Sequence, residues 1–430
     1  MIIRVSPCLL SGTIQAPSSK SLSARFIAAA LLADSQTKLY GLSECDDTTS
    51  ALEISALLGA EIELGKDAIL ITPSKGGIPR PRHNVINAGE SGLAARLFAP
   101  IAALALEKIS ISGERTLLDR PFNMVIDGLS SLGITVSSSD GLLPIEIEGP
   151  ITGGDITIDG SVSSQFLTGL LLALPYAEKD SVITVKNLTS RPYVEMTKEV
   201  MSTYGLDYTH TESDTGIDTF NIPANQTASG GEFSIDGDWS AAATLLVLGA
   251  LCGRPELEIT GLRGDFTQAD SAIKGALLFA GYHILGTDDG LSTKKKRPRA
   301  FDLDLTNSPD LFPVLTALAA FSNKPSRLRG AHRLASKESD RASVLISEFA
   351  KAGIKIDHDI DTDSLVIHPG KVKSARLNSH GDHRIVMAAT ILGCAGDADI
   401  EIIGAECIAK SYPAFFDDIE SVGGIIQEIK

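Results

Sequence analysis

The pattern of apolar and polar residues along this chain repeats. A short strand-like run recurs about every 72 residues, and the six runs end at Gly41, Gly113, Asn187, Gly261, Gly330 and Gly404. A helical pattern follows each run and stops at a second glycine, at Gly59, Gly133, Gly205, Gly281, Gly353 and Gly423. Glycine is common just after a helix because it adopts the left-handed conformation without Cβ strain. Two markers with the same spacing predict six copies of one unit, and these copies fill nearly all of the 430 residues.

A second, more apolar helix is expected upstream of each strand-like run. In residues 166–172 almost every side chain is apolar, which predicts a helix buried on all sides. The alternation in residues 60–64 predicts a half-buried strand after the helix stop. Each unit therefore contains helix, strand, helix and strand, with room for one more strand. The apolar helices begin with small or polar residues of the N-cap type, and such helix starts facing one place form a natural anion site.

Composition and charge narrow the class of protein. The formal net charge of −16 weighs against a nonspecific surface for nucleic acid or acidic membranes. The five cysteines are odd in number and lack CxxC spacing, so we expect neither a disulfide framework nor a zinc site. No signal peptide is apparent, and every apolar stretch is shorter than the roughly 20 residues of a membrane helix. We therefore expect a cytoplasmic protein without a metal site.

Charged, hydroxyl and amide residues, together with one glycine, gather where the helices are predicted to begin. The positions are Lys20, Ser21, Arg25, Glu90, Gly92, Arg96, Arg120, Ser163, Ser164, Gln165, Ser190, Tyr193, Asp310, Lys337, Glu338, Arg341, Asp382, His383, Arg384 and Lys410. Taken singly, each has an ordinary alternative, such as a capped helix with solvated charges or, for residues 337–341, an ion-pair ladder on a surface helix face. Their shared position in the repeat favours a common cleft for small anions, and paired arginines suit carboxylate and phosphate.

Two further segments receive separate interpretations. Asp310 precedes a strongly apolar helix, and burial would raise its pKa, which suits a general base. The basic run at residues 294–299 lies between Asp289-Gly290 and a strand-like segment, so we interpret it as a solvated loop and not as a nucleic-acid patch.

The motifs SSKSLSARFIAAALL, LLDRPF, SVSSQFLTGLL, SRPYVEMT, SPDLFP, SKESDR, GDHR and AKSYP occur in this order. In sequence and spacing the chain resembles the 3-phosphoshikimate 1-carboxyvinyltransferases, also called 5-enolpyruvylshikimate-3-phosphate (EPSP) synthases, from Ser18 to Phe416. The resemblance implies an α/β (α+β) fold: a two-domain inside-out α/β barrel of six β-α-β-α-β-β units, three per domain, with buried helices. It implies one domain of residues 1–18 and 235–430, another of residues 19–234, and an active-site cleft between them. We expect the strand Ile2–Val5 to join the second group of three units, and the fourth unit to begin near Glu232.

The resemblance also implies an activity of the shikimate pathway to chorismate and aromatic amino acids. The enolpyruvyl group of phosphoenolpyruvate moves to the 5-hydroxyl of shikimate 3-phosphate through a tetrahedral intermediate, and phosphate is released. Implied ligands of shikimate 3-phosphate are Lys20, Ser21, Arg25, Ser163, Ser164, Gln165, Ser190, Tyr193, Asp310 and Lys337. Implied ligands of phosphoenolpyruvate are Lys20, Gly92, Arg120, Gln165, Glu338, Arg341, His383, Arg384 and Lys410. Asp310 would be the base, Glu338 and Lys20 would move protons, and the implied protein is a monomer without metal or organic cofactor.

Some residues depart from the family pattern, and three other functions are alternatives. Glu90 and Leu93 stand in a motif usually written Asn-x-Gly-Thr, Arg333 replaces an asparagine, and Trp239 replaces a small residue. A UDP-N-acetylglucosamine enolpyruvyl transferase would carry Lys-Asn at the first helix and a loop cysteine, whereas Lys20 precedes Ser21. A DNA sliding clamp would place its basic residues along helices, whereas the basic residues of this chain stand at predicted helix starts. A non-catalytic relative is the third alternative, and it is suggested by the acid at Glu90.

Overall fold

The computed structural model describes residues 1–161, 163–335 and 337–429. Val162 and Ser336, which belong to two of the motifs above, lie outside the described residues. The chain divides into a C-terminal unit, Met1–Pro17 with Asp236–Lys430, and an N-terminal unit, Ser18–Ile235. These boundaries differ by one residue from those expected from the sequence.

Three four-stranded sheets form the outer layer of the N-terminal unit. Their strand orders are β14-β3-β5-β4, β6-β7-β9-β8 and β10-β11-β13-β12. The strands are β3 (Thr37–Tyr40), β4 (Glu61–Leu64), β5 (Ala68–Thr72), β6 (Val85–Asn87), β7 (Lys108–Ser112), β8 (Thr135–Ser138), β9 (Ile145–Glu148), β10 (Asp155–Asp159), β11 (Ser181–Lys186), β12 (Thr209–Glu212), β13 (Asp218–Ile222) and β14 (Glu232–Ser234). In each sheet the first two strands are parallel and the last two form an antiparallel pair.

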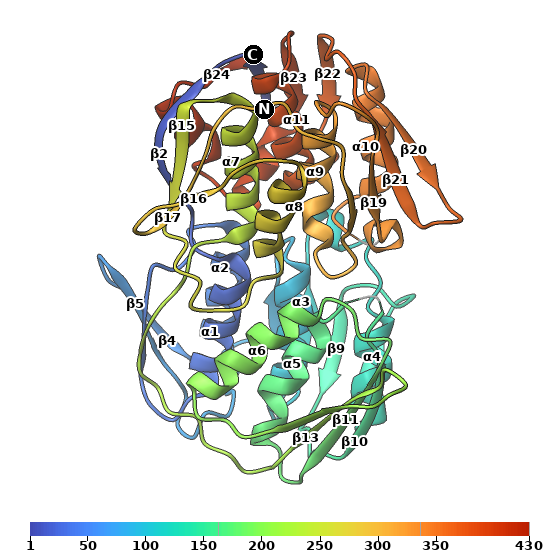
Figure 1. Cartoon of the computed structure of the whole chain (residues 1–430). Helices are drawn as coiled ribbons and strands as arrows, with labels where there is room; N and C mark the ends of the chain where they lie inside the picture. The colour runs from blue at the N-terminus through green and yellow to red at the C-terminus, as the bar shows by residue number, and fades with distance from the viewer. Residues whose placement is uncertain (162, 336, 430) are drawn as a thin grey trace. The chain divides into compact units, whose positions relative to one another are not determined.

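The helices of this unit are of two kinds. They are α1 (Lys20–Leu32), α2 (Asp46–Leu57), α3 (Gly92–Ala102), α4 (Asn123–Ser131), α5 (Gln165–Ala173) and α6 (Arg191–Thr203), with 3-10 turns η1 (Arg115–Leu117) and η2 (Leu174–Tyr176). Helices α1, α3 and α5 pack against one another in the interior, and α5 is buried from Phe166 to Ala173 (Figure 1). The prediction of helices buried on all sides is therefore confirmed, because an all-apolar helix is stable only when no face meets water.

The C-terminal unit repeats the same layers. Its sheets have the orders β16-β17-β15-β2, β18-β19-β21-β20 and β22-β23-β1-β24. The strands are β1 (Ile2–Ser6), β2 (Leu10–Gln15), β15 (Gly253–Thr260), β16 (Leu285–Gly286), β17 (Gly290–Thr293), β18 (Asp302–Asp304), β19 (Ser326–Arg329), β20 (Lys355–Asp359), β21 (Ser364–His368), β22 (Ala375–Asn378), β23 (Ile400–Ile403) and β24 (Ile425–Ile429).

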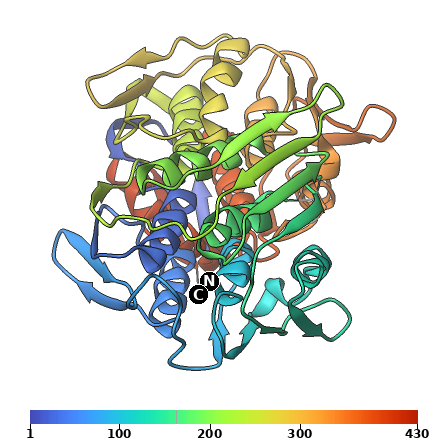
Figure 2. The same cartoon turned by 90° about the horizontal axis from the view of Figure 1, so that it is seen from below.

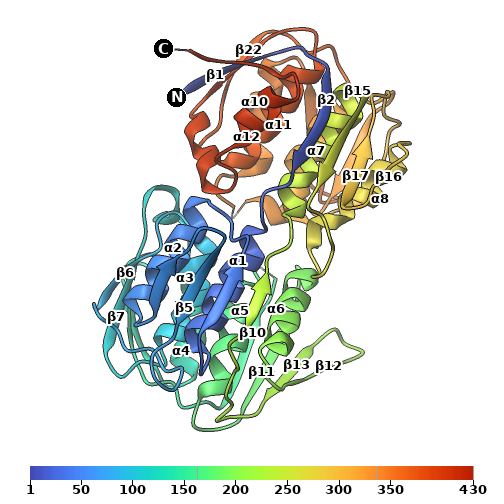
Figure 3. The same ribbon diagram turned by 90° about the vertical axis from the view of Figure 1, so that its left-hand side faces the viewer.

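Helices α7, α9 and α11 form the interior of this unit, with sheet β15–β17 beside α7 (Figure 3). The helices are α7 (Trp239–Cys252), α8 (Ile273–Phe279), α9 (Phe312–Ala319), α10 (Arg341–Lys351), α11 (His383–Ala395) and α12 (Phe415–Ser421), with 3-10 turns η3 (Ala269–Ala272), η4 (Pro309–Leu311), η5 (Ala331–Leu334) and η6 (Ala405–Lys410). Among the described residues, no helix has the length and apolar character needed to cross a membrane.

Three sheets are completed by strands from another part of the chain. The first strand β1 pairs antiparallel with both β23 and β24, which confirms that the N-terminal strand joins the second group of units. The two chain ends accordingly lie side by side in every view (Figure 1, Figure 2, Figure 3). The expectation that the fourth unit begins at Glu232 was wrong. Strand β14 instead pairs parallel with β3 of the first unit, and β2 supplies the missing first strand beside β15.

The predicted glycine stops lie where the outer helices end. All six, from Gly59 to Gly423, have positive φ, between 74° and 113°. A side chain would be strained in that conformation, so glycine is required by the backbone itself. The basic run at residues 294–299 carries no helix or strand, and all its residues except Pro298 are exposed, as predicted for a solvated loop.

Candidate active site

Three of the predicted site residues in the N-terminal unit are the first residues of its interior helices. Lys20 begins α1, Gly92 begins α3 and Gln165 begins α5. The Ser19 and Ser91 hydroxyls accept from the backbone N–H groups of Leu22 and Ala94 at 3.4 and 3.2 Å, which satisfies amides that lack a partner within the helix. The side chains that follow these caps are thus placed where the positive ends of the helix dipoles lie.

Lys20 forms an ion pair that the sequence analysis did not anticipate. Its Nζ lies 2.8 Å from Oδ2 of Asp47 on α2, and only 14% and 9% of the two side chains are exposed. Because the pair is largely shielded from water, Asp47 keeps the ammonium group of Lys20 in place. No sequence signal distinguishes Asp47 from Asp46, the other acid in the first turn of α2.

Arg25 links three helices of the unit. It is 1% exposed, and its Nε donates to the Thr197 hydroxyl at 2.9 Å, while its terminal nitrogens donate to the Ser21 carbonyl, the Thr168 hydroxyl and the Tyr193 carbonyl. Burial lowers the pKa of Arg25 to about 10. Most of its hydrogen-bonding capacity is used within the protein, so Arg25 places Ser21 and Tyr193 as well as carrying charge.

Gly92, Arg120 and Gln165 are brought together by Arg96. The Arg96 guanidinium donates to the Gly92 carbonyl at 3.2 Å and to Oε1 of Gln165 at 3.3 Å. It also donates to the Pro121 carbonyl next to Arg120, at 2.9 Å. A Cβ added to Gly92 would lie 2.5 Å from Nη1 of Arg120, so glycine is what allows that guanidinium to cover the start of α3. Arg96 was expected only as one of the polar residues around an anion cleft, and its place one turn after Gly92 on the same face of the helix could have indicated that it links these residues.

The remaining predicted residues of this unit lie beside helix starts. Ser163 accepts from the Gln165 backbone N–H at 3.2 Å, and Ser164 is the buried residue just before α5. Ser190 immediately precedes α6 with φ of 55°, and Tyr193 lies in the first turn of that helix. These four residues therefore lie at the starts of two helices, α5 and α6, that are in contact.

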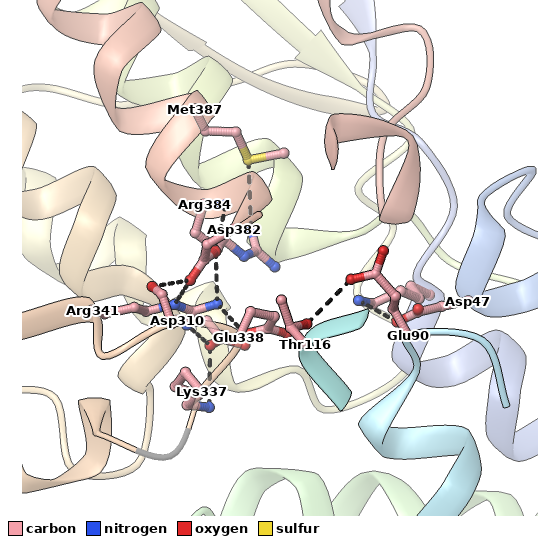
Figure 4. Close-up of polar contacts among 12 residues, drawn as sticks. Asp47, Glu90, Thr116, Asp310, Lys337, Glu338, Arg341, Asp382, Arg384 and Met387 are labelled. Atoms are coloured by element: carbon pink, nitrogen blue, oxygen red, sulfur yellow. Dashed lines mark hydrogen bonds and ion pairs between the residues drawn. The ribbon is translucent and has the colours of Figure 1, made fainter. Parts of the chain in front are cut away.

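Glu90, the unexpected acid, is occupied by neighbouring side chains. Its Oε1 accepts from Arg115 at 3.3 Å and its Oε2 accepts from the Thr116 hydroxyl at 3.2 Å (Figure 4). Both donors belong to η1, the turn that leads to Arg120. Glu90 thus ties the start of α3 to this turn.

In the C-terminal unit the predicted residues surround one buried arginine. Arg341, the first residue of α10, is 1% exposed and contacts three carboxylates (Figure 4). It donates to Asp310 at 2.5 Å, to Glu338 at 2.7 Å and to Asp382 at 2.8 Å. Lys337 reaches the same Asp310 oxygen at 3.2 Å. The alternative of a surface ion-pair ladder at residues 337–341 is therefore wrong, because Arg341 is almost fully enclosed.

Asp382, expected only as one of the polar residues at helix starts, organises this cluster. Its carboxylate is 0% exposed, receives both Nε and Nη2 of Arg341, and caps α11 by accepting from the Arg384 backbone N–H at 2.9 Å. The same group thus fixes the arginine of α10 and the start of α11. Its position immediately before a helix could have identified the cap, but not the contact with Arg341.

The pKa of Asp310 differs from the expectation. Burial alone would raise it, but Lys337, Arg341 and Arg384 outweigh burial and hold the pKa of Asp310 well below its usual range. The prediction of a raised pKa was wrong because it considered the apolar helix and not the three cations. Conversely, burial lowers the pKa of Lys337 despite its acidic neighbour. Asp310 is therefore an ionised carboxylate that can accept a proton only if its cations are drawn away.

His383, Arg384 and Lys410 are buried in the same unit. His383 and Arg384 are the first two residues of α11, and Lys410 ends η6, which packs against that helix. Asp310, Asp238 and Asp270 raise the pKa of Arg384 in spite of its burial. Arg333, which departs from the family pattern, is also buried and donates to the Thr306 carbonyl at 2.8 Å.

Comparisons with known proteins agree with the architecture. A family model described as EPSP synthase (3-phosphoshikimate 1-carboxyvinyltransferase) matches residues 6–419. The chain is 34% identical to the 3-phosphoshikimate 1-carboxyvinyltransferase of Methanocorpusculum labreanum over 100% of both chains. It is also 34% identical to the enzyme of that name from Clostridium kluyveri, over 99% of this chain and 98% of the other.

Solved structures show the same fold. An EPSP synthase from Acinetobacter baumannii matches with a TM-score of 0.82 at 22% identity, over 99% of this chain and 100% of that one. The enolpyruvyl transferase NikO from Streptomyces tendae matches with a TM-score of 0.78 at 16% identity, over 99% and 98% of the two chains. With the family match over nearly the whole length, this chain belongs to the EPSP synthase (3-phosphoshikimate 1-carboxyvinyltransferase) family.

Proposed function

We propose that this chain transfers the enolpyruvyl group of phosphoenolpyruvate to the 5-hydroxyl of shikimate 3-phosphate and releases inorganic phosphate. Its full-length relatives carry the name of that activity. Within the molecule, the observation that supports it most is the cluster in which the partly exposed Asp310, Lys337 and Glu338 meet around the buried Arg341. It combines acids that can exchange protons with cations that can hold anionic substrates, which is what a reaction between two phosphorylated molecules requires.

In the addition step, Asp310 takes the proton of the 5-hydroxyl, and the hydroxyl oxygen forms a bond to C2 of phosphoenolpyruvate. The C3 methylene group receives a proton from Glu338 or Lys20 and becomes a methyl group. Asp310 is a weak base while Lys337 and Arg341 contact it. The substrate anions compete for these cations, and a carboxylate that loses cationic partners gains proton affinity. Substrate binding would thereby activate Asp310.

In the elimination step, a proton leaves C3, the double bond forms again, and the bond from C2 to the phosphate oxygen breaks. The departing phosphate would be held by cations assigned to phosphoenolpyruvate: Lys20, Arg120, Arg341, Arg384 and Lys410. A preorganised donor that meets developing charge contributes about 3–4 kcal/mol. The steps are proton transfers and an addition-elimination, so they need neither a redox group nor a metal.

Recognition of shikimate 3-phosphate is proposed for the hydroxyl-rich helix starts. Ser163, Ser164 and Ser190 would bind its phosphate, with Gln165 and Tyr193 beside its ring. The contact between α5 and α6 supports this assignment, because it brings these hydroxyls into one region of the N-terminal unit. Ser21 and Arg25 would complete the set, and Lys337 and Asp310 would contribute from the C-terminal unit.

Phosphate release with both substrates tests the proposal. Purified protein should release phosphate only when phosphoenolpyruvate and shikimate 3-phosphate are present together. Release with a UDP-linked amino sugar would instead favour the sister transferase, and release with neither acceptor would favour a non-catalytic relative. Asp310→Asn should lower turnover while shikimate 3-phosphate still binds. Asp302→Asn is the matched control, since Asp302 is exposed and pairs with Arg329 in the same unit.

We also propose that the protein is a cytoplasmic monomer that works without a bound cofactor. The steps proposed above are proton transfers and an addition-elimination, which side chains can carry out without a cofactor. Light scattering of the purified chain would measure its mass, and a value near 90 kDa, about twice the 45.3 kDa of the chain, would contradict the monomer.

A further inference from the structure

Ser190 differs in backbone conformation from Ser19 and Ser91, the two serines that cap interior helices of the same unit. Its φ of 55° and ψ of 36° are left-handed, whereas Ser19 and Ser91 are extended. The hydroxyls of Ser19 and Ser91 accept from amides of their own helices, but the Ser190 hydroxyl does not cap α6, a helix that is described along its whole length. A left-handed serine is unfavourable and persists only where neighbouring contacts hold it.

The residue before Ser190 is fixed by hydrogen bonds to the segment that follows β10. The Thr189 hydroxyl lies 2.9 Å from the Gly160 carbonyl oxygen and 3.2 Å from that of Ser161, and it donates to them. The Thr189 backbone N–H also donates to the Gly160 carbonyl, at 3.3 Å. Ser161 stands two residues before Ser163 in the chain. Thr189 therefore joins the segment that leads to Ser163 to the turn that carries Ser190.

The residue after Ser190 is fixed by a buried carboxylate. Nη1 and Nη2 of Arg191 donate to Oδ1 and Oδ2 of Asp218, each at 2.9 Å, so the pair is bidentate. Asp218 is the first residue of β13 and is 0% exposed. Nη2 of Arg191 also donates to Glu212 on β12 at 2.9 Å, but that carboxylate is 53% exposed. Of the two acids, Asp218 is the one that water cannot replace, so it determines where Arg191 lies.

Asp218 is itself held by a histidine of the neighbouring strand. Nε2 of His210 lies 2.8 Å from Oδ1 of Asp218, and the His210 ring stacks on Phe220 with centroids 4.2 Å apart. Nζ of Lys198 lies 3.4 Å from Nδ1, the other ring nitrogen of His210. An ammonium group can only donate, so Nδ1 accepts and Nε2 carries the proton that is donated to Asp218. The carboxylate thus has partners on both β12 and α6 that fix its position.

We propose that Asp218 is a positioning residue for shikimate 3-phosphate: through its bidentate pair with Arg191, it holds Ser190 in the left-handed conformation that presents the serine hydroxyl to the phosphate of that substrate. This inference rests on the proposed function, in which Ser190 binds that phosphate. Because Thr189 and Arg191 are both anchored, Ser190 cannot relax to the extended conformation of a capping serine. A hydroxyl that is already in place loses less freedom on binding, which strengthens binding of the substrate without a part in the bond changes.

The test compares Asp218→Asn with Glu212→Gln, because these variants remove a buried and an exposed acid from the same arginine. Steady-state phosphate release is measured while each substrate is varied. For Asp218→Asn, KM for shikimate 3-phosphate should rise about tenfold, equivalent to 1.4 kcal/mol. Its KM for phosphoenolpyruvate and its kcat should change less than about threefold. Glu212→Gln should match wild type in all three quantities.

A double variant tests whether Asp218 acts through Ser190. Ser190→Ala removes the hydroxyl and leaves the pair of Arg191 and Asp218 in place. In that background, Asp218→Asn should raise KM for shikimate 3-phosphate by less than about a further threefold, because two changes that act on one group are not additive. A further rise of about tenfold would mean that Asp218 acts elsewhere, and it would overturn the inference.

Circular dichroism checks that each variant is folded. If Asp218→Asn does not fold, Arg191→Lys takes its place, because lysine keeps the charge but cannot form the bidentate pair, and the same KM should rise. An unchanged KM for shikimate 3-phosphate, equal increases in both KM values, or an equal effect of Glu212→Gln would overturn the inference. Wild-type protein without phosphate release would instead reject the proposed function, so the two failures are distinguishable.

Discussion

Replacing Asp382 by asparagine tests the buried charge network most directly. The change keeps an oxygen that can cap α11 but removes the negative charge that contacts Arg341. Asp382 and Arg341 are 0% and 1% exposed, so water cannot take the place of the lost partner. Breaking a buried ion pair by removing one partner costs 3–5 kcal/mol. Because Asp310 and Glu338 still contact Arg341, we expect the lower end, about 3 kcal/mol.

The assay is thermal unfolding followed through Trp239, which lies in the same unit as Asp382. For a unit of roughly 200 residues, a loss of about 3 kcal/mol lowers Tm by roughly 6–12 °C. Asp359→Asn is the matched control. Asp359 also accepts from an arginine, Arg327 at 3.1 Å, but the two side chains are 32% and 34% exposed. Its replacement should change Tm far less, since pairs that water can reach contribute little.

Two results would refute this reasoning. If both variants lower Tm equally, burial does not determine the contribution of these pairs. If Asp382→Asn lowers Tm by less than about 2 °C, roughly the effect of 1 kcal/mol at this size, the network does not stabilise the fold. Loss of phosphate release at unchanged Tm would assign Asp382 to substrate binding alone.

Three further changes have defined outcomes. Gly92→Ala places a Cβ 2.5 Å from Nη1 of Arg120 and 2.9 Å from Nη1 of Arg96. The kcat/KM for phosphoenolpyruvate should therefore fall at least about tenfold, and an unchanged kcat/KM would contradict this. Tm should change little, because both nitrogen atoms end flexible side chains. Gly169→Ala places a Cβ on α5 2.4 Å from the Leu97 carbonyl oxygen of α3, and should destabilise by about 1–3 kcal/mol in thermal unfolding. Its control, Gly275→Ala on α8, meets nothing within 4 Å and should not lower Tm. The depressed pKa of Asp310 means that its stabilisation is complete above its ordinary pKa near 4 and is lost as pH falls through the lower folded value. The Tm difference between wild type and Asp310→Asn should therefore stay constant from pH 8 to 5, and a difference that vanishes within that range would disprove the ion-pair explanation.

Local patterns predicted much of the repeat. Glycine at the six helix stops is required by positive φ at each position, and that requirement acts within a few residues of the chain. The burial of α5 follows from its all-apolar composition. The starts of α1, α3 and α5 follow from the small or polar residues there. For α1 and α3 a serine just before the helix caps it. For the same reason, many candidate residues could be placed at helix starts without a structure.

The repeating unit of the fold and the positions of polar groups along the chain can therefore be read from local patterns. The tertiary structure decided which distant segments pair: β14 joins β3, and β2 joins β15, because a sheet edge accepts any strand that satisfies its hydrogen bonds. The folded chain also sets the proton affinity of Asp310, because Lys337 and Arg341 reach it from other segments. It sets the role of Arg96 in the same way, because its partners Gln165 and Pro121 lie far along the chain. Electrostatic and hydrogen-bond energies depend on distances in space, and those distances arise only when the chain has folded.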